Sequence, residues 1–241
     1  IHRVLQVLLM VGEWRHPIKW LYGALNEVIR EPSTKLRDKW VELIGKDIED
    51  KEWDRMVAYP HKVSRNTRLK YIQLNYLHQT YLTPKKIMVI YKEGPKGCPR
   101  CRKEGADFEH MMWGCPIIQR YWEEVLNKIG EVLDREMQCN IEVCLMGAFP
   151  RPKKNKAGNR FVDLALVLAR RGITMAWKSP EGPKGDKWEK EVLKWAEAEH
   201  QILKKEEAKG LRKNPMAEDW ATIMRNFVEE KGQETNSENG E

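Results

Sequence analysis

The feature that most constrains how this chain can fold is the segment at residues 97–116, "GCPRCRKEGADFEHMMWGCP". It contains Cys98, Cys101, His110 and Cys115 at the spacing C-x2-C-x8-H-x4-C, and so holds three of the five cysteines. A C-x2-C turn places two thiolates at the separation that a tetrahedral zinc ion requires, and a third thiolate with one imidazole completes four ligands. No position is left for water, so we predict one structural Zn2+ per chain rather than a hydrolytic metal.

The alternative for this segment is a chance coincidence, in which three core thiols lie beside a surface histidine. Its glycine, proline and charged residues are typical of a loop and not of a core, which favours the metal site. Within the segment we expect Asp107 to cap a short helix that presents His110. We expect Gly114 to turn the chain so that Cys115 closes the site.

Outside this motif, apolar residues recur mostly at helical spacing. The predicted helices lie at about 16–30, 33–45, 48–57, 67–81, 84–90, 117–133, 160–177 and 188–203, with a last one around Trp220 and Phe227. We therefore predict a mainly α fold, with helical bundle segments on either side of a small CCHC zinc knuckle.

The same pattern predicts how the chain is divided. The expected segments are a helical part at 1–92 that is basic towards its C-terminal end, the CCHC zinc knuckle at 93–116, an amphipathic helix at 117–146 that packs on the knuckle, a basic linker at 147–159, a C-terminal helical segment at 160–230 and a disordered tail at 231–241. The first residues are interpreted as the cut end of an internal helix, so we expect the chain to be a fragment of a longer protein.

Two further observations limit the compartment in which the chain is expected to act. Cys139 and Cys144 have no second pair to complete a metal site, so we interpret them as ordinary thiols in a reducing compartment. No apolar run reaches the roughly 18 residues that a membrane span requires, so we expect no membrane partner and no secretion.

The net charge of +7 is concentrated in two blocks. Residues 61–97 contain eight Lys or Arg and one carboxylate, while residues 151–190 contain eleven Lys or Arg and four carboxylates. No acidic residue occurs from 56 to 91. Two separate basic blocks indicate a surface that follows a polyanion.

Tyrosines are interleaved with these cations, as in proteins that hold phosphates with Lys or Arg and stack bases on aromatic rings. The candidate nucleic-acid contacts are Lys62, Arg65, Arg68, Lys70, Tyr71, Tyr81, Lys85 and Lys86, then Arg100, Arg102 and Lys103 in the knuckle, and Lys153, Lys154 and Lys156 in the linker. The alternatives are a helical bundle whose cations lie over apolar surface beside half-buried tyrosines, and a solvated loop at the linker, where Arg151 and Arg160 add to the charge.

Residues 98–122, "CPRCRKEGADFEHMMWGCPIIQRYW", resemble the zinc-binding region of non-LTR (LINE-type) retrotransposon reverse transcriptases. The stretches "DKEWDRMV", "SRNTRLKYIQLNYLHQTYLTPKKI" and "LARRGITMAWKSP" resemble the same family in the same order, so the similarity covers roughly residues 35–200. The resemblance implies a C-terminal region that binds template RNA, target DNA or both during target-primed reverse transcription. It also implies an upstream polymerase domain in the parent chain and a ribonucleoprotein in the nucleus and cytoplasm.

The chain departs from that family in its catalytic motifs. The Y/F-x-D-D signature of the polymerase is absent, and no match is found to the Pro-Asp plus Asp/Glu-x-Lys pattern of the related endonucleases. We therefore expect no catalytic residue and no small-molecule substrate. Three alternatives stay open. The first is a zinc-stapled protein–protein adaptor that uses the helices at 117–133 and 188–203, and the second is a domesticated derivative that binds RNA in a host role. The third is a nuclease, which would need clustered carboxylates and an open metal position that the sequence does not show.

Overall fold

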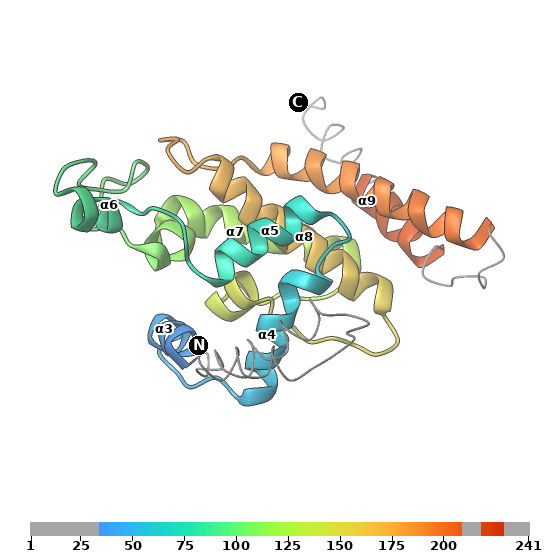
Figure 1. Ribbon diagram of the computed structural model, residues 1–241. Coiled ribbons are helices and arrows are strands. Elements are labelled where there is room, and N and C mark those ends of the chain that lie inside the picture. Colours follow the sequence, from blue (N-terminus) through green and yellow to red (C-terminus); the bar gives the residue numbers. More distant parts are fainter. Residues whose placement is uncertain (1–33, 209–217, 229–241) are drawn as a thin grey trace, which may run out of the picture. The chain divides into compact units, whose positions relative to one another are not determined.

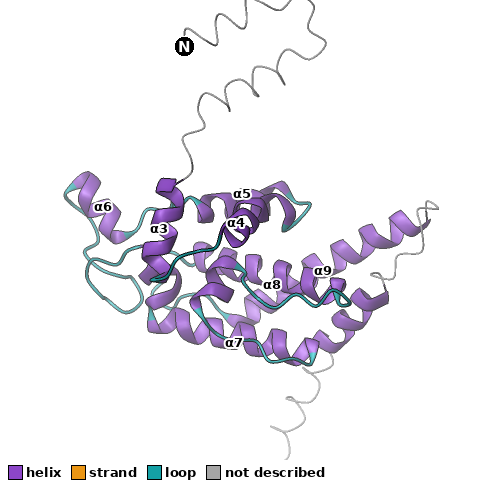
Figure 2. Ribbon diagram, turned by 90° about the horizontal axis from the view of Figure 1, so that it is seen from below, coloured by secondary structure: helices purple, strands orange, loops and turns teal. Residues whose placement is uncertain are grey.

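The structure is a computed structural model that describes residues 34–208 and 218–228. The chain divides into two compact units, Ile1–Glu49 and Asp50–Glu241. Within the described ranges every regular element is a helix and no strand occurs, which confirms the predicted mainly α fold (Figure 2). The helix predicted at 16–30 and the tail at 231–241 lie outside the described residues.

In the first unit the structure describes one helix, α3 (Thr34–Ile44). It ends at Gly45, which has a left-handed φ of 77° and donates its N–H to the carbonyl of Val41 at 2.8 Å. Glycine is common at this position after a helix, because it adopts the left-handed conformation without strain. After the turn, the Arg37 guanidinium donates to the carbonyl of Ile48.

The second unit contains the remaining elements. They are α4 (Asp50–Lys62), α5 (Thr67–Leu77), α6 (Pro84–Tyr91), the π-helical turn η1 (His110–Gly114), α7 (Pro116–Leu133), a second π-helical turn η2 (Glu142–Met146), α8 (Lys156–Met175), α9 (Gly185–Ala208) and a helix at 218–228. None of the helices in the described ranges combines the length and the apolar character needed to cross a membrane.

Helix α8 is the centre of this unit, and α5, α7 and α9 pack against it (Figure 1). Its sequence is apolar on most of its circumference, so it can be buried on several sides at once. Trp188 of α9 donates its indole N–H to the carbonyl of Ala165 at 3.0 Å. Phe161, also on α8, packs edge-on against the rings of Trp220 and Phe227.

A buried arginine joins α8 to α5. Arg170 is fully buried, and it donates to the carbonyl of Cys144 at 2.9 Å and to Oε1 of Gln73 at 3.0 Å. Its guanidinium also lies 5.7 Å and 5.3 Å from the ring centroids of Tyr59 and Tyr76. These contacts fix the basic helix α5 on the same core that supports the metal-binding segment.

Three predicted boundaries differ from the structure for identifiable reasons, and the first two involve α4 and the linker before α8. Helix α4 passes through Pro60 to Lys62, because Tyr59 and Pro60 are buried in the core and this burial outweighs the local preference of proline. The predicted linker 147–159 ends at Asn155, whose side chain caps α8 by accepting from the N–H of Gly158 at 2.7 Å.

Helix α5 ends at Leu77 and not near residue 81, because a Schellman motif stops it. Thr80 donates its N–H to the carbonyl of Asn75 at 3.0 Å, and Gln79 donates to that of Tyr76 at 2.9 Å. Gln79 occupies the left-handed position with a φ of 51°, where glycine is usual. Because glutamine and not glycine stands at this position, the end of the helix could not be recognised from the sequence.

We expect Gln79→Gly to raise the free energy of unfolding by up to about 1 kcal/mol, because a Cβ atom is disfavoured in the left-handed region. The substitution also removes a buried Nε2 atom that has no hydrogen-bond partner. Urea unfolding measures the change, and Gln79→Ala, which keeps the Cβ atom, is the matched control. A glycine variant less stable than the alanine variant would contradict the assignment.

Candidate metal centre

The first half of the metal-binding segment is a tight hairpin. Gly97 and Glu104 form an isolated antiparallel bridge, and Cys98 donates its N–H to the carbonyl of Lys103 at 2.8 Å. A Cβ atom on Gly97 would lie 2.7 Å from the carbonyl oxygen of Arg102, so only glycine fits at this position. The hairpin brings the first two cysteines of the motif together.

The second half is helical, as predicted, but its turn is wider than an α-helix. Asp107 Oδ1 accepts from the N–H of His110 at 3.1 Å, which is the predicted cap. Cys115 then donates its N–H to the carbonyl of His110 at 3.0 Å, a π-helical bond that spans five residues. This bond brings His110 and Cys115 to the same side of the turn.

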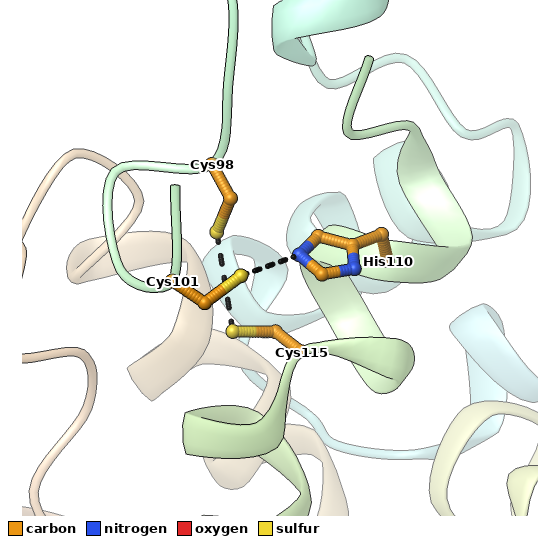
Figure 3. A group of neighbouring side chains, drawn as sticks. All are labelled: Cys98, Cys101, His110 and Cys115. Atoms are coloured by element: carbon orange, nitrogen blue, oxygen red, sulfur yellow. Dashed lines mark hydrogen bonds between the residues drawn. The ribbon is translucent and has the colours of Figure 1, made fainter. Parts of the chain in front are cut away.

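The ligand atoms of the four motif residues all lie within 4.8 Å of one another (Figure 3). Cys98 Sγ is 3.9 Å from Cys115 Sγ, and Cys101 Sγ is 3.2 Å from His110 Nε2. Cys98 and Cys115 are fully buried, and His110 is 2% exposed. Three thiols and one imidazole therefore converge on a point that could hold a metal ion.

The protonation of these groups is set by their burial and by backbone donors. Burial raises the pKa of the Cys115 thiol to about 11. At Cys98 burial acts in the same direction, but the N–H groups of Cys101 and Arg100 outweigh it and lower the pKa of that thiol. Burial, assisted by the charge of Lys103, lowers the pKa of His110 and favours the neutral imidazole that metals bind.

Arg100 lies beside the thiols and not in solvent. Its side chain is 7% exposed, and its Nη1 donates to the carbonyl of Met111 at 3.1 Å. Its Nε and Nη2 atoms are buried without a hydrogen-bond partner. Burial lowers the pKa of Arg100, while Cys98 and Cys115 act in the opposite direction. A metal bound by three thiolates would carry excess negative charge, and this guanidinium is placed to offset it.

Helices around the site hold it in place. Helix α7 begins immediately after Cys115, and Trp122 on its second turn donates its indole N–H to the carbonyl of Met112 at 2.9 Å. On another side, Lys85 of α6 lies 3.5 Å from Asp107, and the ring of Phe108 lies 5.3 Å from that of Tyr76 on α5. The centre therefore connects α5, α6 and α7.

The residues predicted to contact nucleic acid differ in how exposed their side chains are. The exposed ones are Lys62, Arg65, Arg68, Tyr71, Lys85, Arg102, Lys103, Lys153, Lys154 and Lys156. Lys70, Tyr81 and Lys86 are half-buried, and Lys86 donates to the carbonyl of Gln79. Arg100 is the only buried member of the set, so we remove it from the candidate surface.

Two further arginines, one in the predicted basic linker and one directly after it, form ion pairs within the fold. Arg151 pairs with Asp163 at 2.7 Å and lies 4.0 Å from the ring centroid of Phe149. Arg160 pairs with the buried Glu199 at 2.8 Å. A carboxylate with little exposure needs a cation nearby, which explains why these two arginines turn inward.

Helix α6 carries an exposed apolar surface that the sequence pattern does not indicate. Val89, Ile90 and Tyr91 are 64%, 57% and 63% exposed, and Leu82 before the helix is 48% exposed. A helix of eight residues is too short for a reliable periodicity, so the direction of these side chains could not be predicted.

None of the models of known protein families matches this chain.

Proposed function

We propose that the metal of this site is zinc and that its role is structural. With Zn–S bonds of about 2.3 Å and Zn–N bonds of about 2.05 Å, a regular tetrahedron has S–S edges of about 3.8 Å and S–N edges of about 3.6 Å. The separation of 3.9 Å between Cys98 and Cys115 and that of 3.2 Å between Cys101 and His110 are close to these edges. Zinc would supply four bonds that tie the hairpin to the start of α7.

We further propose that the chain binds single-stranded nucleic acid next to this centre. The observation that carries the proposal is the surface of α4 and α5, where Lys62, Arg65, Arg68 and Tyr71 are all exposed and no carboxylate occurs from residue 56 to 91. Arg68 and Tyr71 are three residues apart on α5, so they lie on one face. A cation and a 65% exposed ring on one face can hold a phosphate and stack a base.

The resemblance to non-LTR retrotransposon reverse transcriptases supports a specific role for this binding. We propose a non-catalytic C-terminal region that holds template RNA or target DNA during target-primed reverse transcription, attached to a polymerase domain elsewhere in the parent chain. Such a ribonucleoprotein would act in the nucleus and form in the cytoplasm. A domesticated derivative of the same region would use the same surface.

A second candidate function is a protein–protein adaptor, and the apolar surface of α6 favours it. Val89, Ile90 and Tyr91 are adjacent and mostly exposed, which is typical of a protein contact. An adaptor would bind its partner through apolar burial, so its affinity would change little with salt. Nucleic-acid binding would weaken steeply with salt, because each neutralised phosphate releases counterions.

The test is binding of a fluorescent single-stranded oligonucleotide, as RNA and as DNA, over a salt series. We expect Lys62→Glu/Arg68→Glu to lower the log–log salt slope by about 1.4 and the affinity about 25-fold at 0.1 M salt, at about 0.7 per phosphate contact. Tyr71→Ala should reduce affinity with little change in slope, because stacking releases few counterions.

The matched control is Lys204→Glu/Lys205→Glu, which makes the same charge change at two exposed positions of α9. If the control and the α4–α5 variant lose the same affinity, the binding is an effect of net charge alone. If the wild-type chain shows no salt-dependent binding, the adaptor becomes the better explanation.

A further inference from the structure

A groove of about 670 Å3 lies between α8 and α9. Its lining comes from the last two turns of α8, the connecting residues 176–184 and the first three turns of α9. Leu168 and Trp188 are 2% and 4% exposed and form its apolar base, while Met175 is 73% exposed at its edge. Its volume falls within the roughly 300–1,000 Å3 that is typical of ligand sites.

The groove carries an excess of positive charge, with five cations and two carboxylates in its lining. The two carboxylates are already paired within the lining, Glu191 with Arg171 and Glu181 with Lys184. Lys187 and Lys194 are exposed and form no ion pair within the part of the chain that the structure describes. These two lysines are therefore available to an anion.

The spacing of these lysines fits a chain of anions better than a single one. Lys187 and Lys194 are seven residues apart on α9, so they lie on one face with about 10 Å between them along the helix axis. A stacked nucleic-acid strand carries one charge per about 3.4 Å, so this distance spans about three nucleotides. Two lysines at this spacing can therefore each neutralise a different phosphate of one strand.

The connecting segment places the groove next to the metal centre and the basic residues of α6. Trp177 donates its indole N–H to the carbonyl of Leu82 at 2.9 Å, and its ring lies 5.4 Å from that of Tyr81. Further along, a Cβ atom on Gly182 would lie 2.8 Å from Ile117 and 3.6 Å from Arg100. One wall of the groove therefore rests on the knuckle and on the residues that precede α6.

We propose that this groove is a second contact site for single-stranded nucleic acid, in which Lys187 and Lys194 neutralise phosphates and the apolar base receives a nucleobase. The proposal rests on the proposed function and extends it to residues that the sequence pattern does not single out. An acidic peptide is the alternative occupant. The chemistry favours nucleic acid, because the only guanidinium of the lining, Arg171, is already paired and cannot form the bidentate bond that carboxylates prefer. Lysine is an effective phosphate ligand as a point charge.

The experiment uses the full chain with zinc bound and a fluorescent single-stranded RNA over a salt series. We expect Lys187→Glu/Lys194→Glu to weaken binding about 25-fold at 0.1 M salt and to lower the salt slope by about 1.4, as for two lost phosphate contacts. Lys204→Glu/Lys205→Glu, on the same helix but outside the groove, should have a much smaller effect. Both lysine pairs are exposed, so both variants should fold, and zinc content with circular dichroism checks this.

Three outcomes overturn the proposal. If the groove variant binds RNA like the control while Lys62→Glu/Arg68→Glu still loses affinity, the groove makes no contact and the proposed function stands. If the groove variant loses binding to poly-glutamate but not to RNA, the groove is a site for an acidic peptide. If the wild-type chain does not bind RNA even at low salt, the groove proposal and the proposed function both fail.

Discussion

We expect Cys115→Ser to abolish the proposed zinc binding and to lower the free energy of unfolding of the second unit by more than about 4 kcal/mol. Zinc binding contributes about 10–16 kcal/mol in small zinc peptides. In such peptides the metal alone holds the folded structure together, so its binding energy stabilises the fold directly. Here η1 and α7 also make core contacts, so we expect helices α8 and α9 to survive the loss. The protein should be purified without added metal, and elemental analysis with urea unfolding measures the effect.

The position of Cys115 makes this substitution specific. Its carbonyl accepts the N–H groups of Ile118 and Gln119 at the start of α7, and these backbone bonds do not depend on the side chain. Serine is also a favourable residue before a helix, so the variant loses a ligand and keeps the cap. Cys139→Ser, at an exposed thiol outside the cluster, is the control. A Cys115→Ser protein that still contains one zinc and unfolds like the wild type would show that the four residues do not form the site.

The ligand set could be predicted from the sequence because all four ligands fall within 18 residues and their geometry is local. The shape of the turn between them could not. An ordinary α-helix after Asp107 would not bond Cys115 to His110, and no residue in "HMMWG" indicates the π-helical bond that does so. Such turns depend on the ends of the segment being fixed by other contacts, here the burial of Met111 and Met112 and the bond from Trp122.

The same limit applies to the charged residues. The sequence pattern assigned Arg100 to the solvent because its neighbours Pro99, Arg102 and Lys103 are typical of an exposed turn. In the structure Arg100 turns inward to donate to the carbonyl of Met111, and Gly182, more than 80 positions away, lies close to its side chain. Contacts of this kind link residues with no periodic relation, so composition and spacing cannot find them. The groove between α8 and α9 was missed for the same reason.

The other large effect is expected at Arg170. We expect Arg170→Ala to lower the free energy of unfolding by about 3–5 kcal/mol, because it leaves a cavity and removes the donors to Cys144 and Gln73. Arg170→Met fills most of the volume without a donor, so it should cost less than the alanine variant. Arg171→Met at the next position of α8 is the matched control. It breaks only a partly exposed ion pair with Glu191, which is worth less than about 1 kcal/mol.

A double-mutant cycle then separates hydrogen bonding from packing at this arginine. Gln73 is 4% exposed and accepts from Arg170 Nη1, so Gln73→Ala and Arg170→Met remove the two ends of one buried bond. If the bond is real, the losses should be non-additive by about 1–3 kcal/mol, in the range for hydrogen bonds to charged groups. Additive losses would mean that the bond to Gln73 contributes nothing to stability, and that Arg170 acts through its bond to Cys144 and its packing. Helix α5 carries both the buried Gln73 and the exposed Arg68 and Tyr71. A coupled pair would therefore also mean that Arg170 helps to fix the position of the candidate nucleic-acid surface relative to the metal centre. RNA affinity of the Arg170→Met protein, measured where it is still fully folded, tests that link directly.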